Sequence, residues 1–222
     1  MAMDLYDALW QSNFKRVKEL VEGGIVLNTD EYWSPLFIAA FVGEIKIVKY
    51  LLAHGARPTL QTINQCVRYE CAPHIFKRLL KTGIDVNQNP EILINAARDG
   101  RYRLTSRLLE SGANPNIPDA GGTTALMMAA YYAHIGIMER LFAYGADVNR
   151  RDDNGENALF YAVAWAAPLS VFKWLVEHGI DLNVRTKKEK MTILQWMRHP
   201  EGFGYNPNNE IDRYLVACGA HL

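Results

Sequence analysis

The sequence predicts an all-α protein in which one helix-turn-helix unit is repeated about seven times and stacked into a solenoid. Three features predict it. An apolar pair, two variable residues and a glycine recur seven times along the 222 residues. Each glycine ends a stretch whose apolar residues are spaced by three and four, as on one face of a helix. Pairs of alanines stand upstream of several of these stretches, and such self-similarity is typical of units that bury their apolar faces against their neighbours.

The glycine motif sets the period of the repeat. Its copies are Leu20-Val21-x-x-Gly24, Leu51-Leu52-x-x-Gly55, Leu79-Leu80-x-x-Gly83, Leu108-Leu109-x-x-Gly112, Leu141-Phe142-x-x-Gly145, Leu175-Val176-x-x-Gly179 and Leu215-Val216-x-x-Gly219. Successive glycines are between 28 residues (Gly55 to Gly83) and 40 residues (Gly179 to Gly219) apart. Because a glycine just beyond a helix can take the left-handed conformation that caps it, each copy is expected to end the second helix of a unit.

The first helix of a unit begins at segments such as Ser34-Pro35. Serine accepts hydrogen bonds from the free amide groups of the first turn, and proline fits the first helical position. The alanine pairs Ala39-Ala40, Ala96-Ala97 and Ala129-Ala130 fall on this helix, where small side chains let neighbouring units approach closely. Short extended segments after the glycines, such as residues 146–149, are expected to form hairpin loops.

Together, the Ser/Thr-Pro-Leu-x-x-Ala-Ala and Leu-Leu-x-x-Gly-Ala-Asp-Val-Asn segments resemble the ankyrin repeat, in register over nearly the whole chain. Residues 29–58 and 117–149 resemble it most closely. Residues 59–87 resemble it least, with Cys66-Val67 in place of the alanine pair and Cys71-Ala72-Pro73 where a glycine turn is expected. We therefore expect residues 59–87 to form the least stable interior unit.

The resemblance implies a single ankyrin-repeat domain over residues 1–222. Residues 4–28 would be an N-terminal capping unit, residues 29–183 five internal repeats, and residues 184–222 a divergent C-terminal capping unit with a long loop. Capping units are expected because an open stack must end in a polar face.

Composition argues against several classes of partner. The 24 basic and 24 acidic side chains give zero net charge, so no overall field attracts nucleic acid. The longest apolar runs, residues 36–42 and 158–167, are shorter than the ~20 residues of a membrane-spanning helix. The N-terminus has acids where a secretory signal has basic residues, and three cysteines suit a reducing compartment. We therefore expect a cytoplasmic protein that contacts neither nucleic acid nor membrane and is a monomer without its partner.

Candidate catalytic and metal-binding groups are few. Cys66, Cys71 and His74 fall close enough in sequence to suggest a metal set, but no second ligand pair with zinc-like spacing accompanies them. Cys71 and His74 could act as nucleophile and base, but no orienting third residue accompanies that pair. The basic run at residues 185–190 is interpreted as a solvated surface, with contact to an acidic partner as the alternative. We expect no cofactor, no metal ion and no catalytic residue.

Partner binding is expected on the hairpin tips and the exposed side of the first helices, because the resemblance implies that surface. The residues at those positions are unusually aromatic. They are Trp10, Trp33, Ile38, Phe41, Tyr69, Arg98, Met128, Tyr131, Tyr132, Tyr161, Trp165 and Trp196. The alternative is that the same rings pack against the adjacent repeat. Hairpin acids at Asp30, Glu31, Asp119 and Asp152 are expected to add an acidic edge, which opposes nucleic-acid binding.

Three hypotheses about function follow. The first is a protein-binding module that occludes or inhibits one partner, for example an immunity protein for a toxin or enzyme, since no second domain is expected to relay a signal. The second is an adaptor or secreted effector that recruits a host or cellular protein. The third, from another class, is an enzyme that uses Cys71 and His74.

Overall fold

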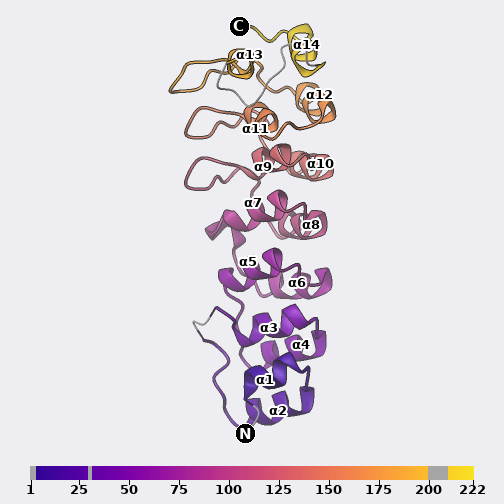
Figure 1. Ribbon diagram of the computed structural model, residues 1–222. Coiled ribbons are helices and arrows are strands. Elements are labelled where there is room, and N and C mark those ends of the chain that lie inside the picture. Colours follow the sequence, from indigo (N-terminus) through magenta and orange to yellow (C-terminus); the bar gives the residue numbers. More distant parts are fainter. Residues whose placement is uncertain (1–3, 30–31, 200–209) are drawn as a thin grey trace. The chain divides into compact units, whose positions relative to one another are not determined.

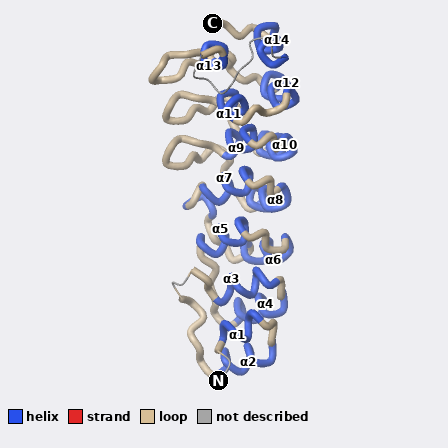
Figure 2. Tube along the Cα trace, viewed as in Figure 1, coloured by secondary structure: helices blue, strands red, loops and turns tan. Residues whose placement is uncertain are grey.

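The computed structural model describes residues 4–29, 32–199 and 210–222 (Figure 1). Within these ranges the chain forms fourteen α-helices and one 3-10 turn and contains no β-strand (Figure 2). The all-α prediction is confirmed. None of the helices in those ranges combines the length and the apolar character needed to cross a bilayer. The chain folds as two compact units, residues 1–92 with 106–113 and residues 93–105 with 114–222; a single domain over the whole chain stays a prediction.

The first unit contains three helix pairs. They are α1 (Leu5–Trp10) with α2 (Phe14–Glu22), α3 (Pro35–Val42) with α4 (Ile45–Ala53), and α5 (Leu60–Arg68) with α6 (Pro73–Leu80). The first helices α1, α3 and α5 contact one another in succession, and the second helices α2 and α4 also contact each other. First and second helices therefore form two separate layers. The 3-10 turn (Val86–Gln88) follows α6.

The second unit repeats this plan. Helix α9 (Ala125–Tyr131) contacts α10 (Ile135–Ala143), and α11 (Ala158–Ala164) contacts α12 (Leu169–Glu177). The last pair is α13 (Ile193–Met197), which contacts α11, and α14 (Glu210–Ala217), which contacts α12. The division between the units falls within α7 (Glu91–Arg98) and within α8 (Tyr102–Glu110). The described residues thus contain the seven helix pairs that the period predicts.

The predicted capping groups are in place. All seven motif glycines have positive φ, from 81° at Gly179 to 99° at Gly219, so the left-handed turn after each second helix is confirmed. At the start of α3, Ser34 Oγ accepts a 3.3 Å hydrogen bond from the Phe37 amide. The three predicted alanine pairs are fully buried. Since interiors are close-packed, these small side chains permit the close approach of successive first helices.

In five of the repeats, an asparagine side chain links its loop to the loop of the next repeat. Asn149 Nδ2 donates to the Gly179 carbonyl at 2.9 Å, and Asn149 Oδ1 accepts from the Asp181 amide at 2.7 Å. Each bond satisfies a backbone group and contributes about 1 kcal/mol. The same donor bond to the next motif glycine is made by Asn28, Asn87, Asn116 and Asn183. We call these five residues the asparagine ladder.

The asparagine ladder is interrupted at Thr59, which occupies the corresponding position of its repeat. Its hydroxyl is used for capping α5 instead, because it accepts from the Thr62 amide at 3.1 Å and lies 3.1 Å from the Thr62 hydroxyl. In the described ranges Thr59 makes no hydrogen bond to Gly83. The loop that ends at residue 59 therefore lacks the link that the other loops have.

Residues 59–87 are expected to be the least protected interior unit against hydrogen exchange. The missing ladder bond removes one contact to the following loop, and the fully buried Cys66 and Val67 replace the alanine pair. Peptide-level exchange measured by mass spectrometry should give lower protection for α5 and α6 than for α9 and α10. Equal protection of the two helix pairs would contradict this expectation.

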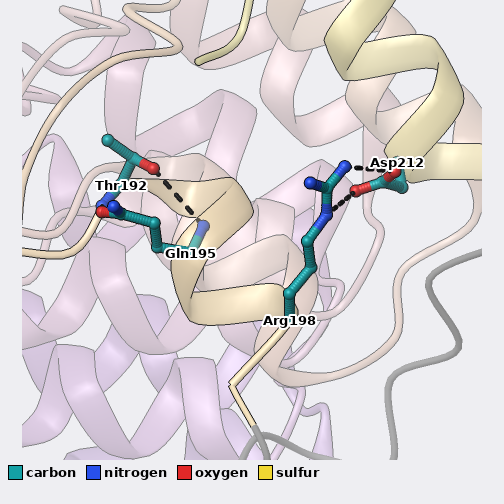
Figure 3. A network of polar contacts seen from close by, with 4 residues as sticks. All are labelled: Thr192, Gln195, Arg198 and Asp212. Carbon is teal, nitrogen blue, oxygen red and sulfur yellow. Dashed lines mark hydrogen bonds and ion pairs between the residues drawn. The ribbon is translucent and has the colours of Figure 1, made fainter. Parts of the chain in front are cut away.

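Polar contacts hold the last helix pair together, as Figure 3 shows. Arg198, at the end of α13, donates from Nε to Asp212 Oδ1 at 3.0 Å and from Nη2 to Asp212 Oδ2 at 2.8 Å. The Asp212 side chain is only 6% exposed, so this two-bond ion pair is shielded from water. At the other end of α13, Thr192 and Gln195 form a capping box, and the Thr192 hydroxyl donates to the His221 carbonyl at 2.9 Å.

Replacing Asp212 by asparagine is expected to weaken the attachment of α14 by about 1–3 kcal/mol, because the guanidinium loses its charged partner. The Arg198 side chain is 33% exposed, which keeps the effect below that of a fully buried pair. Hydrogen exchange of α14 is the measurement, with Glu210→Gln in the same helix as the control. If both variants exchange alike, the ion pair does not hold the helix.

Candidate functional site

Five large rings of the first unit gather where its first helices end. Trp10 ends α1, Tyr32 and Trp33 precede α3, Phe41 lies in the last turn of α3, and Tyr69 caps the C-terminus of α5. Their exposed fractions range from 36% for Trp33 to 46% for Trp10. We call these five residues the first aromatic patch.

Trp33 joins the first aromatic patch to the core. Its ring centroid lies 5.9 Å from that of Trp10 and 5.6 Å from that of Tyr69. The fully buried Phe37 lies 5.2 Å from Trp33. Each such aromatic contact contributes about 0.5–1.5 kcal/mol beyond its area burial. These rings pack on one another and on the core, and they still present exposed surface.

Polar contacts fix the loop that carries Tyr32. The side chain of Gln65, which is buried in α5, donates from Nε2 to the Tyr32 carbonyl. The hydroxyls of Tyr32 and Tyr69 lie 3.5 Å apart. This contact lowers the pKa of Tyr32 and raises the pKa of Tyr69. Both side chains are exposed.

A second group of rings lies at the ends of α9 and α11. The Tyr131 ring stacks on Trp165 with centroids 5.2 Å apart and contacts Tyr132 at 4.8 Å. Tyr132 is 36% exposed and Trp165 is 59% exposed, whereas Tyr131 is half-buried. The Tyr132 ring also stacks on His134, whose Nε2 lies 3.1 Å from the Arg98 carbonyl. We call Tyr131, Tyr132 and Trp165 the second aromatic patch.

Ile38 was wrongly assigned to the binding surface. It is fully buried, like the other residues of α3 from Pro35 to Ala40. The helix is apolar on all sides, so hydrophobic periodicity gave no indication of which face is covered.

The remaining predicted residues are less exposed or less aromatic. Arg98 is half-exposed and pairs with its neighbour Asp99 at 2.9 Å. Met128 and Trp196 are half-buried, and the Trp196 ring lies 6.0 Å from that of Phe160. The structure thus brings together Trp10, Trp33, Phe41 and Tyr69 on one unit, and Tyr131, Tyr132 and Trp165 on the other.

Asp152 and Tyr161 have internal roles. The Tyr161 hydroxyl donates to Asp152 Oδ2 at 3.0 Å, and Asp152 Oδ1 accepts from the Asn154 and Glu156 amides at 2.9 Å and 2.8 Å. Burial raises the pKa of Tyr161 and also that of Glu156. Asp152 is only 5% exposed, so its expected place in an acidic edge is wrong. Of the other acids assigned to that edge, Asp119 is half-buried, and Asp30 and Glu31 lie outside the described residues.

The predicted binding residues do not include Tyr32 of the first aromatic patch or the buried Phe37 that supports it. Tyr32 stands next to Trp33 in the loop. Phe37 was not singled out at all, although it is the fully buried ring on which Trp33 and Tyr69 pack, at 5.2 Å and 5.9 Å. The sequence feature that indicates its role is its position directly after Ser34-Pro35-Leu36, which is in the first turn of a first helix.

The two cysteines and His74 differ in their exposure to solvent. Cys71 is 2% exposed and Cys66 is fully buried, whereas His74 is exposed. A hydrogen bond with Cys71, followed by burial, raises the pKa of the Cys66 thiol. Within the described part of the chain, no three His, Cys, Asp or Glu side chains are grouped to hold a metal ion.

Comparisons with known proteins identify the repeat. The family model "Ankyrin repeats (3 copies)" matches residues 63–152 and 93–186, and the model "Ankyrin repeat" matches residues 31–63. The ankyrin repeat domain-containing protein SAT10 of Stachybotrys chartarum is 32% identical over 155 residues, which cover 67% of this chain and 8% of SAT10. The putative ankyrin repeat protein FPV031 of fowlpox virus is 29% identical over 215 residues, which cover 91% of this chain and 54% of FPV031. This chain therefore matches only part of the length of either relative.

The fold agrees with this match. The crystal structure of the human ASB11 ankyrin repeat domain superposes with a TM-score of 0.76 at 20% identity, over 98% of each chain. Ankyrin repeats generally mediate protein–protein interaction and are typically non-catalytic scaffolds. The chain belongs to the ankyrin-repeat family.

Proposed function

We propose that this chain binds another protein through its two aromatic patches and thereby occludes or inhibits that partner. The observation that carries the proposal is the first aromatic patch, in which five neighbouring rings are each more than a third exposed. Contiguous apolar surface is rarely left bare on a soluble protein, and aromatic side chains are enriched among the residues that dominate binding energy. The balanced charge of the chain supports a protein partner over nucleic acid or membrane.

The packing of the rings supports tight binding. Trp10, Trp33 and Tyr69 already contact one another, so little side-chain freedom is lost when a partner covers them. A prepared surface lowers the dissociation rate more than it raises the association rate. Slow dissociation suits an inhibitor that must keep one partner occluded. We place this function in the cytoplasm, with the chain a monomer until it meets the partner.

Recruitment by an adaptor or effector is the second candidate, and one observation favours it. Each of the two compact units carries an aromatic patch of its own. Two patches can hold two different proteins as well as one. The first function predicts that disrupting either patch weakens capture of the same partner, whereas recruitment predicts that each patch retains its own.

The test is capture from an extract of the native source followed by an activity assay. Trp33→Ala is expected to lose the captured partner, whereas Tyr144→Ala, which removes a 38% exposed ring at the end of α10, should keep it. The purified partner should then lose its own activity when one equivalent of the chain is added. Full partner activity in the complex would refute inhibition and favour recruitment. If the Trp33→Ala variant still captures the partner, the first aromatic patch does not bind it.

A further inference from the structure

A cavity of about 520 Å³ opens in the first unit, away from the rings that form the aromatic patches. It lies between the last turns of α4 and α6 and the loops that follow them. Its lining includes Leu52, Ala56, Arg57, Arg78, Lys81 and Gly83. This volume is in the range of pockets that bind small molecules.

The cavity lies where the asparagine ladder is interrupted. In the other loops, an asparagine donates to the carbonyl of the next motif glycine and draws two successive loops together. Here Thr59 caps α5, and the loop containing Gly83 and Ile84 is not tied to the preceding one by such a bond in the described residues. Both Gly83 and Ile84 line the cavity, as does Pro58, the neighbour of Thr59.

All the charged side chains that line this cavity are positive. Arg57 occupies the position that is Asp85, Asn114, Asp147 or Asp181 in later repeats. No aspartate or glutamate is among the described residues that line the cavity. Arg57, Arg78 and Lys81 are all exposed, and no ion pair involves them in the described ranges. The lining of the cavity therefore includes three cations without an acidic partner in the described part of the chain.

The second helix of the following repeat shows that this charge is not a general property of the repeat. In α8, Arg107 occupies the position of Arg78, and Glu110 occupies that of Lys81. Arg107 Nη1 contacts Glu110 Oε2 at 2.6 Å, which neutralises the arginine. At the end of α6 the corresponding residue, the C-cap Lys81, has the same charge as Arg78 and cannot neutralise it. Three departures from the repeat, at Arg57, Thr59 and Lys81, thus converge on the one cavity.

We propose that this cavity binds a small organic phosphate. Arginine side chains present paired donors that match phosphate oxygens, and a phosphate dianion gains more from three cations than a carboxylate does. The wall formed by Leu52, Ala56 and Ile84 offers an apolar surface for the organic part of the ligand. This site is separate from partner binding by the aromatic patches and does not depend on it.

The test is an NMR titration of the folded chain with phenyl phosphate, benzoate and inorganic phosphate. Amide shifts at Gly83 and Ile84 should saturate with phenyl phosphate at a concentration about tenfold lower than with benzoate. Inorganic phosphate should shift the same amides more weakly, because it lacks the apolar part. Failure of the wild-type chain to bind phenyl phosphate at millimolar concentration would overturn the proposal.

Lys81→Glu provides a matched variant, since it recreates the Arg107–Glu110 arrangement on α6 and should fold normally. It is expected to weaken phenyl phosphate binding by about tenfold or more. Lys188→Glu makes the same change of charge at a lysine whose side chain is 91% exposed in the second unit, and should have no effect. If both variants weaken phenyl phosphate binding equally, the ligand responds to the overall charge of the chain and not to this cavity, and the proposal is overturned.

Thr59→Asn is a second, independent variant. Asparagine is also a good helix cap, and it can supply the missing bond to Gly83. This variant should melt at a higher temperature and bind phenyl phosphate less well, because the two loops are drawn together. Unchanged binding of phenyl phosphate with a raised melting temperature would contradict the link between the asparagine ladder and the cavity.

A glutamate-rich peptide tests the identity of the ligand. If it binds the wild-type chain more tightly than phenyl phosphate does, the choice of ligand is overturned and the cavity is assigned to protein carboxylates.

Discussion

Replacing Tyr132 and Trp165 together by alanine is expected to abolish partner binding while leaving a folded, helical protein. Truncation of an interface ring of this kind costs roughly 2 kcal/mol or more of binding free energy. The two rings are 36% and 59% exposed, so their removal does not open a core cavity. The lost contacts with Tyr131, at 4.8 Å and 5.2 Å, should reduce stability by only about 0.5–1.5 kcal/mol each.

Two measurements on the same samples separate binding from folding. A thermal melt followed by circular dichroism reports the stability of the free protein, and a titration with the captured partner reports affinity. Phe142→Ala, which removes a 41% exposed ring from α10, is the control and should bind normally. A large drop in melting temperature, with unchanged affinity in the folded fraction, would show that the second aromatic patch is core and not interface.

Replacing Phe37 by alanine is expected to reduce the free energy of unfolding of the first unit by about 3–5 kcal/mol, the usual cost of removing a buried ring. Phe37 is fully buried and contacts Trp33 and Tyr69 at 5.2 Å and 5.9 Å. Its loss removes the packing that holds both rings in the first aromatic patch. Partner binding should therefore weaken as well, although Phe37 itself is not exposed to a partner.

The control for this prediction is Phe37→Leu, which keeps most of the buried volume. It should cost much less than the alanine variant, because core substitutions that conserve volume are tolerated better. Urea unfolding of both variants gives the comparison. If alanine and leucine destabilise equally, the aromatic contacts with Trp33 and Tyr69, and not the filled volume, hold the patch in place.

The fold could be predicted from the sequence where one residue type has a strong conformational reason to be present. The glycine after each second helix is such a case, because all seven have positive φ and other residues adopt it at a cost. The equivalent turn after several first helices was not predictable, because Ser12, Glu70, Ala133 and Ala166 adopt positive φ there without being glycine. The repeat period, and not the local sequence, located those helix ends.

The candidate site was predictable in part for a related reason. The register of the repeat placed Trp10, Phe41, Tyr69 and Trp165 within the two positions that follow the small-residue pair of each first helix, and all four are exposed. Register does not report burial when a helix is apolar on every side, which is why Ile38 was assigned wrongly. The contacts that bury Asp152 involve the backbone of its own loop and the Tyr161 hydroxyl, and spacing alone does not reveal them.

The interrupted ladder was visible in the sequence as a threonine where other repeats have asparagine. Its meaning was not, because each asparagine bonds to a loop that lies 25 to 36 residues further along the chain. To connect Thr59 and the nearby cations with a binding site, one must know which loops face each other in the structure.

The stability of stacked repeats is the sum of the stability of each repeat and of the interfaces between neighbours, so each folded repeat favours the folding of the next. Each bond of the asparagine ladder adds to that coupling. Where Thr59 interrupts the asparagine ladder, the interface between neighbouring repeats contributes less free energy, and folding is expected to be less cooperative there.

Under mechanical force the repeats before residue 59 should then unfold separately from those after it. The chain would lengthen in separate steps, and Thr59→Asn should merge the steps that meet at this joint.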